Sequence, residues 1–236
     1  MTYRARHRWH GWMLVSLACL MIAPLAACHA KSPTPEAEAI PLATPARAGS
    51  MSVEEALANR RSRRDYTDDL IKSEALMQLL WAAQGITDAA SGFRTAPSAG
   101  ATFPLVVYVA VGRVEGLKAG VYRYRPQPHD LQRMLDEDVR PALERAAIGQ
   151  LWIGNGAAVL VFAADYARTT QRYGERGIRY VHMEVGHAAQ NVYLQAEALG
   201  LGTVAVGAFD DDAVKRITGL RETETPLYLM PVGKVR

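Results

Sequence analysis

The sequence contains only two cysteines among its 236 residues, Cys19 and Cys28, and both lie near the N-terminus. The chain after position 28 therefore has no thiol and can form no disulfide bond. Zinc–thiolate sites and iron–sulfur clusters need cysteine ligands, and nucleophilic cysteine catalysis needs a thiolate. The sequence excludes these three chemistries from that part of the chain. It also tolerates an oxidising compartment, because it has no thiol that could be oxidised.

The sequence also lacks a hydrophobic run of the roughly 20 residues that a membrane-spanning helix needs. Its longest run, Met13 to Leu25, follows three arginines and precedes small residues, a pattern typical of a secretory signal peptide. The four residues Leu25-Ala26-Ala27-Cys28 resemble the bacterial lipobox, in which the cysteine becomes the lipidated first residue of the mature chain. We expect a signal peptide over residues 1–27, lipidation of Cys28, and export to the periplasmic side of a bacterial membrane. A cysteine that follows small residues by chance is the alternative.

The mature chain lacks an excess of one charge. The full sequence has 27 Lys and Arg against 24 Asp and Glu, and the three arginines of the signal, Arg4, Arg6 and Arg8, account for the difference. Nucleic-acid binding depends on a basic excess, so we expect no nucleic acid partner. The glycine-rich dinucleotide fingerprint GxGxxG is absent as well.

The remaining sequence divides into a tether and one domain. Residues 28–51 are rich in proline, alanine and small polar residues without apolar periodicity, which is typical of a flexible tether. Residues 52–236 have the length of a single domain. Ser52 and Glu55 form a capping-box pattern for a helix that ends near Asn59. Ser73 can cap a second helix, whose apolar residues share one face and which Gly85 ends.

Apolar and β-branched segments predict strands in the rest of the domain, and a hairpin joins two of them through a turn at residues 125–130. The segments are Leu105–Val111, Gly120–Tyr124, Leu131–Leu135, Ala157–Ala163, Thr203–Val206 and Leu227–Val232. A long helix is expected from Ile178 to Leu199. Helices mixed with hairpins favour an α+β fold with a mainly antiparallel central sheet flanked by helices.

Two short segments carry residues suited to ligand binding. Asn59 to Tyr66 holds four arginines and one serine, and guanidinium groups bind phosphate in a bidentate manner. A solvated basic turn is the alternative. The segment Arg94 to Pro104 is small and polar, and its Gly100 would let the backbone approach a ligand closely. An ordinary loop is the alternative there.

The long helix contains a glycine in its interior, Gly186, which costs about 1 kcal/mol relative to alanine. We therefore expect another chain segment, such as a partner helix, to approach it. Glu184 and His187 have the spacing of carboxylate-bridged metal sites, but these need two such units and only one is present. We expect no metal and a packed, hydrogen-bonded His187. Tyr173 and Tyr180 are candidates for proton donors, with packing in the core as the alternative.

Together these segments resemble the nitroreductase superfamily, and most closely its SagB-type branch, whose dehydrogenases oxidise azoline rings in modified peptides. The resemblance covers roughly residues 52 to 236. Its motifs are Arg60-Arg61-Ser62-Arg63-Arg64, Pro97-Ser98-Ala99-Gly100-Ala101, the helix from Gly186 to Gly202, and the tail from Pro231 to Arg236. The asparagine that is usual in the ring-binding loop of the family is not evident here.

The resemblance implies an intertwined homodimer that binds FMN at its interface. The phosphate and ribityl end would be held by Arg60, Arg61, Ser62 and Arg64, with added charge from Lys234 and Arg236. The isoalloxazine ring would lie beside Val206 and Gly207, and against Pro97, Ser98 and Gly100 of the other subunit. In such enzymes the flavin carries the chemistry, and the protein orients it.

These expectations lead to three hypotheses. The first is an FMN-dependent oxidoreductase that transfers electrons between a donor such as NAD(P)H and a small organic substrate, or that dehydrogenates an azoline-like substrate. The second is a flavin-binding or ligand-binding lipoprotein without turnover. The third is a structural lipoprotein whose motifs are accidental.

Overall fold

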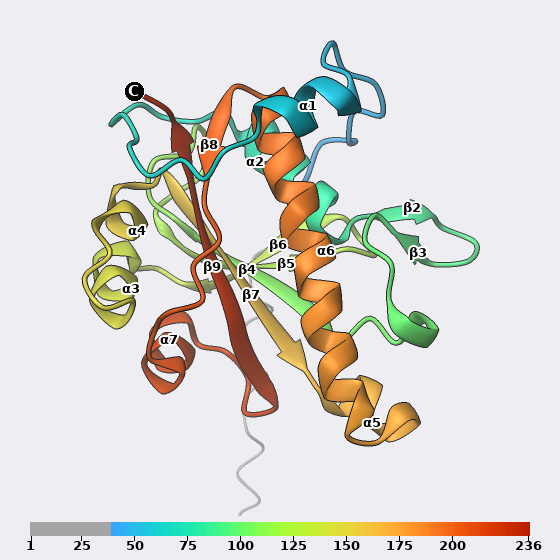
Figure 1. Ribbon diagram of the computed structural model, residues 1–236. Helices are drawn as coiled ribbons and strands as arrows, with labels where there is room; N and C mark the ends of the chain where they lie inside the picture. Colours follow the sequence, from blue (N-terminus) through green and yellow to red (C-terminus); the bar gives the residue numbers. More distant parts are fainter. Residues whose placement is uncertain (1–38) are drawn as a thin grey trace, which may run out of the picture. The chain divides into compact units, whose positions relative to one another are not determined.

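A computed structural model describes residues 39–236, so the predicted signal peptide and Cys28 lie outside the described residues. The described part is built on a seven-stranded sheet in the order β1-β6-β5-β4-β7-β9-β8, with every neighbouring pair antiparallel (Figure 1). The strands are β1 (Ala39–Pro41), β4 (Leu105–Val111), β5 (Gly120–Arg125), β6 (Asp130–Leu135), β7 (Ala158–Asp165), β8 (Leu201–Thr203) and β9 (Glu224–Lys234). A short hairpin of β2 (Ile86–Asp88) and β3 (Phe93–Arg94) stands apart from this sheet. The predicted α+β fold with a mainly antiparallel sheet is confirmed.

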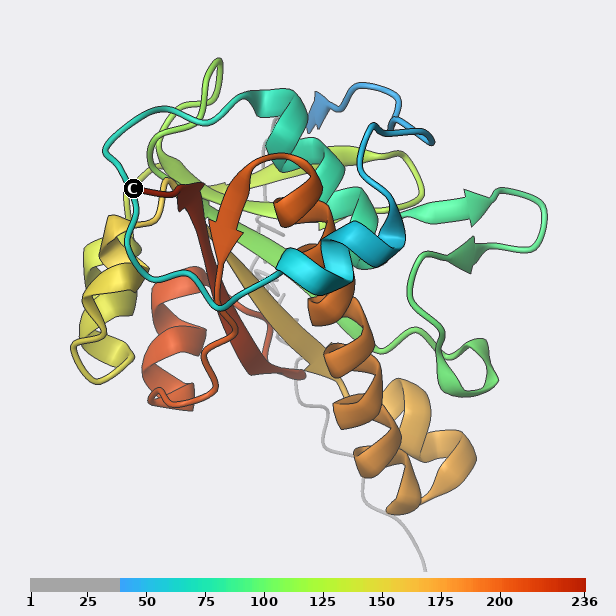
Figure 2. The same cartoon turned by 45° about the horizontal axis from the view of Figure 1, so that its top comes forward.

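Helices cover both faces of the sheet (Figures 1 and 2). One core contains α2 and α6, and the other contains residues of α3, α4 and α7. The helices are α1 (Val53–Asn59), α2 (Ser73–Gln84), η1 (Ala99–Ala101), α3 (Arg140–Ala146), α4 (Leu151–Asn155), α5 (Ala167–Tyr173), α6 (Arg176–Ala198) and α7 (Asp211–Thr218). Over residues 39–236, no helix combines the length and the apolar character needed to cross a membrane.

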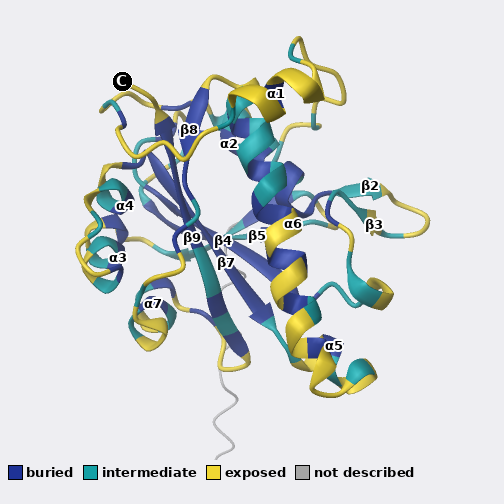
Figure 3. Cartoon of the chain, in the orientation of Figure 1, coloured by how far each residue is buried: buried dark blue, intermediate teal, exposed yellow. Residues whose placement is uncertain are grey.

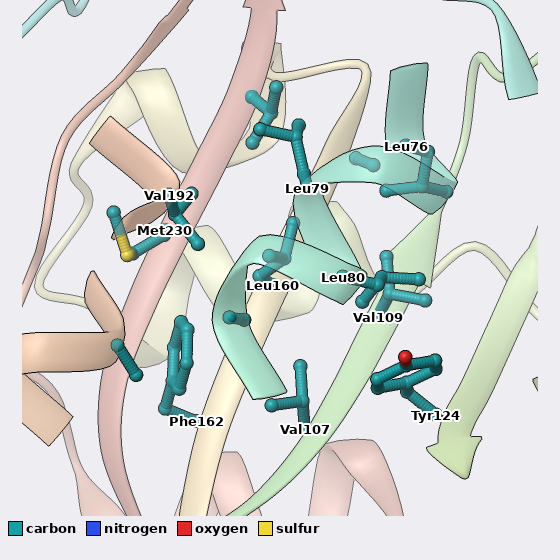
Figure 4. Packing of buried hydrophobic residues seen from close by; sticks show 14 of the residues in the cluster. Leu76, Leu79, Leu80, Val107, Val109, Tyr124, Leu160, Phe162, Val192 and Met230 are labelled. Atoms are coloured by element: carbon teal, nitrogen blue, oxygen red, sulfur yellow. The ribbon is translucent and has the colours of Figure 1, made fainter. Parts of the chain in front are cut away.

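Burial on both faces explains why the central strands are continuously apolar. Along β4, Val107 and Val109 point into the core below α2 and α6, whereas Val106 and Tyr108 point into the opposite core. Leu79 and Leu80 of α2 pack against the first of these cores, as Figure 4 shows. Each such side chain contributes about 1.5–3 kcal/mol when fully buried. Figure 3 shows the result, with β4 and β7 dark and the outer helix faces exposed.

The predicted tether over residues 28–51 differs from the structure in its second half. Strand β1 pairs with the edge strand β6, in the register Ile40 with Leu131. Farther along, the amide of Ala46 donates to Gln78 Oε1 over 2.9 Å. An edge strand exposes unpaired N–H and C=O groups, and pairing with β1 satisfies those of β6. Ile40 also adds a partly buried apolar side chain to the core. The packed part therefore begins before residue 52.

Some of the predicted helix and strand boundaries agree with the structure, and others differ from it. Ser52 caps α1, since its Oγ accepts from the Glu55 amide over 3.1 Å. Ser73 is the first residue of α2 and not its cap; Lys72 takes that position without a side-chain bond. The strand expected from Thr203 to Val206 ends at Thr203, and only an isolated bridge joins Val206 to β9.

Candidate functional site

The arginine segment, residues 60–66, starts where α1 ends and crosses the end of β8 toward the C-terminus (Figure 2). Its backbone is fixed there, because the Arg63 amide donates to the Thr203 carbonyl over 2.9 Å. Tyr66 forms a further bridge with Val235. Gly202 permits this close approach, since a Cβ at that position would lie 2.7 Å from the Cβ of Arg63. The segment therefore adds an irregular border to the sheet.

The side chains of this segment remain open to ligands. Arg61, Ser62, Arg63 and Arg64 are exposed, and Arg60 is half-buried. Among residues 39–236, no carboxylate lies within 4.0 Å of any of the four guanidinium groups. A group of guanidiniums without acidic partners favours binding of a phosphate, with which it forms strong charge-assisted hydrogen bonds.

Two aromatic residues that the sequence analysis did not single out support these arginines. The Arg60 guanidinium lies 5.4 Å from the centre of the Tyr193 ring, and that of Arg64 lies 5.4 Å from the Trp152 ring. Such stacking orients a guanidinium while leaving its edge free. Tyr193 belongs to the long helix motif, whereas nothing in the sequence around Trp152, in α4, marks it as a neighbour of Arg64.

Tyr193 also links the arginine segment to the loop after β8. Its Oη lies 3.0 Å from Ser62 Oγ and accepts from the Ala205 amide over 2.8 Å. Replacement of Tyr193 by phenylalanine removes both bonds and leaves the ring in place. We expect a loss of about 1–2 kcal/mol of stability and an increase in the FMN dissociation constant of about tenfold. Thermal unfolding and flavin titration of the full chain measure both; an unchanged FMN affinity would exclude this linking role.

The loop after β8 brings two further predicted residues to the same side. Val206 exchanges backbone hydrogen bonds of 2.9 Å with Leu229, and Gly207 is exposed. A Cβ at Gly207 would contact the Tyr228 ring at 3.5 Å. Nearby in the chain, the hydroxyl of Thr203 is buried and has no hydrogen-bond partner among the described residues. An open backbone with an unsatisfied polar atom close by fits a ligand bound along this loop.

The two predicted C-terminal cations lie beside the segment but already have acidic neighbours. Lys234 Nζ lies 3.6 Å from Asp69, and Arg236 Nε lies 3.3 Å from Asp65. All four side chains are largely exposed, so solvent screens these pairs. A phosphate could therefore compete for the two cations.

The predicted ring-binding loop lies elsewhere in the chain, with α6 between it and the arginine segment (Figure 1). Ser98 Oγ accepts from the Phe103 amide over 2.9 Å. Gly100 adopts a φ of +60°, and its carbonyl accepts from Arg172 over 3.0 Å. Pro97 and Gly100 are exposed. A single chain does not bring this loop to the arginine segment, so a site that uses both requires two chains.

The middle of α6 presents different residues inward and outward. Glu184 is only 3% exposed, and its Oε1 has no partner among the described residues. Burial raises the pKa of the Glu184 carboxyl to about 7, against the opposing effects of the Ser98 hydroxyl and of Arg94. His187 is exposed, so the prediction of a packed histidine is wrong. No group of three or more potential metal ligands occurs within residues 39–236.

The raised pKa of Glu184 gives a pH dependence of stability. Because the carboxyl titrates at about 7 in the folded chain and at its ordinary lower value when unfolded, the folded chain binds more protons between these values. The free energy of unfolding should therefore fall by about 2–3 kcal/mol as pH rises from about 5 to about 8. Glu184→Gln should remove this fall, whereas Glu175→Gln, at an exposed position, should keep it. Urea unfolding across this range measures the slope; an equal slope in Glu184→Gln would assign the effect to other groups.

Gly186 and Tyr180 belong to the outer part of α6, and Tyr173 belongs to the preceding helix α5. Apart from the adjacent backbone of α6, no described atom would lie within 4 Å of a Cβ at Gly186. Nothing in the described chain therefore requires a glycine there. The rings of Tyr173 and Tyr180 pack edge to face at 5.2 Å. Met183, three residues before Gly186, and Ile178, eight residues before it in α6, are exposed as well. These features fit a face that another chain covers.

Comparison with known proteins identifies relatives over nearly the whole domain. Residues 57–234 match the profile described as "Nitroreductase family". A Methanocaldococcus jannaschii protein whose name places it among nitroreductases is 52% identical over 184 residues, which cover 78% of this chain and 91% of that protein. The solved structure of a Ralstonia eutropha protein described as a nitroreductase superposes with a TM-score of 0.75 at 29% identity, covering 86% of this chain and 92% of that one.

More distant relatives are covered only in part. The microcin B17-processing protein McbC of Escherichia coli is 27% identical, over 67% of this chain and 60% of McbC. The NADPH-flavin oxidoreductase of Vibrio harveyi is 30% identical, over 43% of this chain and 45% of that enzyme. The chain therefore spans about half the length of these two relatives.

Proposed function

Because the chain belongs to the nitroreductase family, we propose that it is an FMN-dependent oxidoreductase that transfers electrons between a reduced donor such as NAD(P)H and a small organic substrate. The observation that carries the proposal is a group of four guanidiniums on the border of the sheet that have no carboxylate within 4.0 Å among residues 39–236. The name of the Vibrio harveyi relative, which includes both flavin and NADPH, supports the same cofactors.

The residues present fit a flavin. Its phosphate would bind among Arg60, Arg61, Ser62 and Arg64, with Lys234 and Arg236 at the rim, because these groups supply donors and positive charge along one border of the sheet. The exposed backbone at Gly207, next to the buried Val206, would lie along the ring. When bound, the flavin supplies hydride and electron transfer, and the chain supplies orientation and electrostatics.

A homodimer would complete the site. The loop with Pro97, Ser98 and Gly100 is separated from the arginine segment by α6 (Figure 1), so in the dimer it would serve the flavin held mainly by the other copy. The outward face of α6 around Gly186 offers the contact surface, since small residues let helices approach closely. Intertwining through this helix would place both loops in reach of one ligand.

The substrate class and the place of action are further parts of the proposal. Similarity to the microcin B17-processing protein supports dehydrogenation of an azoline-like substrate as one activity of this chain. The signal and lipobox pattern supports a lipid-anchored protein on the periplasmic side of a bacterial membrane. Nicotinamide donors are scarce there, which favours a donor or acceptor of another kind. A flavin-binding lipoprotein without turnover is the alternative.

Anaerobic titration of the full chain distinguishes these functions. The flavin-loaded protein in detergent would be mixed with NADH, NADPH, a reduced quinone or an azoline-containing peptide in separate samples. We expect bleaching of the flavin absorbance by at least one of them and its recovery on addition of an acceptor. Bound flavin that none of these compounds reduces would favour the alternative without turnover.

A further inference from the structure

A cavity lies away from the arginine segment, at the end of the sheet where β4 and β5 separate. Its volume is about 240 Å³. The pairing of β4 with β5 starts at Tyr108 with Arg123, so Leu105 to Val107 have no partner strand on that side. The cavity walls are these three strand residues, the turn from Pro126 to Pro128, and side chains from neighbouring elements. The fold thus leaves a hollow with an apolar wall and free backbone.

Four arginines line this cavity, and three of them have carboxylate partners. Arg123 lies 3.2 Å from Glu224, Arg168 lies 3.6 Å from Asp165, and Arg125 forms an ion pair with Asp130. These pairs neutralise most of the charge. The fourth arginine, Arg94, determines the net charge that the cavity offers to a ligand.

Arg94 has no carboxylate within 4.0 Å among residues 39–236. Its Nη1 donates to Gln84 Oε1 over 2.7 Å, and its guanidinium lies 4.5 Å from the centre of the Phe103 ring. Burial lowers the pKa of this guanidinium, Glu184 opposes that effect, and Arg168 adds to it. Arg94 is half-buried, and a cation held partly out of water without a carboxylate neighbour costs free energy, so an anion in the cavity would stabilise it.

Gln84 supplies an independent sign of a missing acceptor. This side chain is 1% exposed and lines the cavity. Its Oε1 accepts from Arg94, which places its amide nitrogen on the donor side, and that Nε2 has no hydrogen-bond partner among the described residues. Buried polar groups are nearly always hydrogen-bonded. A donor and a cation side by side in one cavity fit an oxygen ligand with negative charge.

We propose that this cavity binds a small organic monocarboxylate. Its carboxylate would accept from the free edge of the Arg94 guanidinium and from Gln84 Nε2, and its apolar part would lie against Ile86 and Pro126. A single unpaired cation favours a monoanion over a phosphate dianion. The cavity contains none of the residues assigned to the flavin, although Arg94 stands three residues before Pro97 of the predicted ring-binding loop.

Calorimetric titration of the full chain with benzoate as the probe tests the site. We expect saturable 1:1 binding of benzoate, much weaker binding of its neutral analogue benzamide, and weaker binding of inorganic phosphate. Arg94→Gln should weaken benzoate binding at least tenfold, a factor that corresponds to the loss of one charge-assisted contact. Arg216→Gln, at an exposed position of α7, is the matched control and should bind as the original chain does.

A second variant keeps the test decisive if Arg94→Gln fails to fold. Gln84→Glu is nearly isosteric and places a carboxylate beside Arg94, so it should fold at least as stably and lose benzoate binding. No binding of benzoate by the original chain, equal binding of benzamide, preferred binding of phosphate, or undiminished benzoate binding in Gln84→Glu would each overturn the proposal.

Discussion

A full chain in which Arg60 and Arg64 are both replaced by alanine should purify without flavin, whereas the original chain should purify with FMN bound. Each guanidinium–phosphate contact contributes about 1.5–3 kcal/mol. The double substitution should therefore weaken FMN binding by roughly 10²- to 10⁴-fold. Since neither arginine has a carboxylate partner among residues 39–236, the change leaves no acidic group uncompensated. The fold should persist.

The matched control is a double substitution of exposed arginines at a distance, Arg145→Ala with Arg216→Ala in α3 and α7. It removes the same formal charge and should leave the flavin in place. Fluorescence titration with FMN gives the dissociation constants, and circular dichroism verifies folding. Retention of FMN with unchanged affinity in the Arg60 and Arg64 variant would remove the basis for a phosphate site at this segment.

Substitution of Gly186 by arginine should convert the protein to a monomer and abolish flavin retention. Nothing in the described chain would clash with a side chain at this position, and loss of a mid-helix glycine should stabilise the helix by about 1 kcal/mol. At an interface between two copies, however, the change buries two unpaired charges. Each costs several kcal/mol, so the dimer dissociation constant should rise by roughly 10³-fold or more.

The variant Thr223→Arg, at an exposed turn before β9, adds the same single charge and should remain a dimer. Sedimentation velocity in detergent gives the oligomeric state of both variants. If Gly186→Arg were less stable as a monomer, the failure would be one of folding, which thermal unfolding detects. A dimeric Gly186→Arg chain that keeps its flavin would show that this face of α6 is not the interface.

The main elements could be predicted because their patterns are local. Leu105 to Val111 is apolar throughout since cores lie on both faces of β4, and the glycine after α2 ends that helix as expected. Helices α3, α4, α5 and α7 have only five to eight residues, too few for a clear periodicity. Strand β1 was missed because the pairing of Ile40 with Leu131 depends on contact between distant parts of the chain.

The candidate site was likewise predictable only where its residues form a local motif. Four arginines around Ser62 are visible as a motif, and the C-terminal cations do lie beside them. The partners of these arginines are not visible in the sequence, because Tyr193 and Trp152 come from α6 and α4 and meet the segment only in the folded chain. That Arg94 has no carboxylate within 4.0 Å among residues 39–236 could not be recognised either, since this depends on the packing.

The most direct test of the account is the mass and the flavin content of the full chain, measured together on one sample. Multi-angle light scattering with flavin absorbance, corrected for detergent, should give a particle of two chains with one FMN for each chain. A monomer that binds no FMN at saturating concentration would contradict the account, and so would a monomer that binds FMN as tightly as the dimer is expected to.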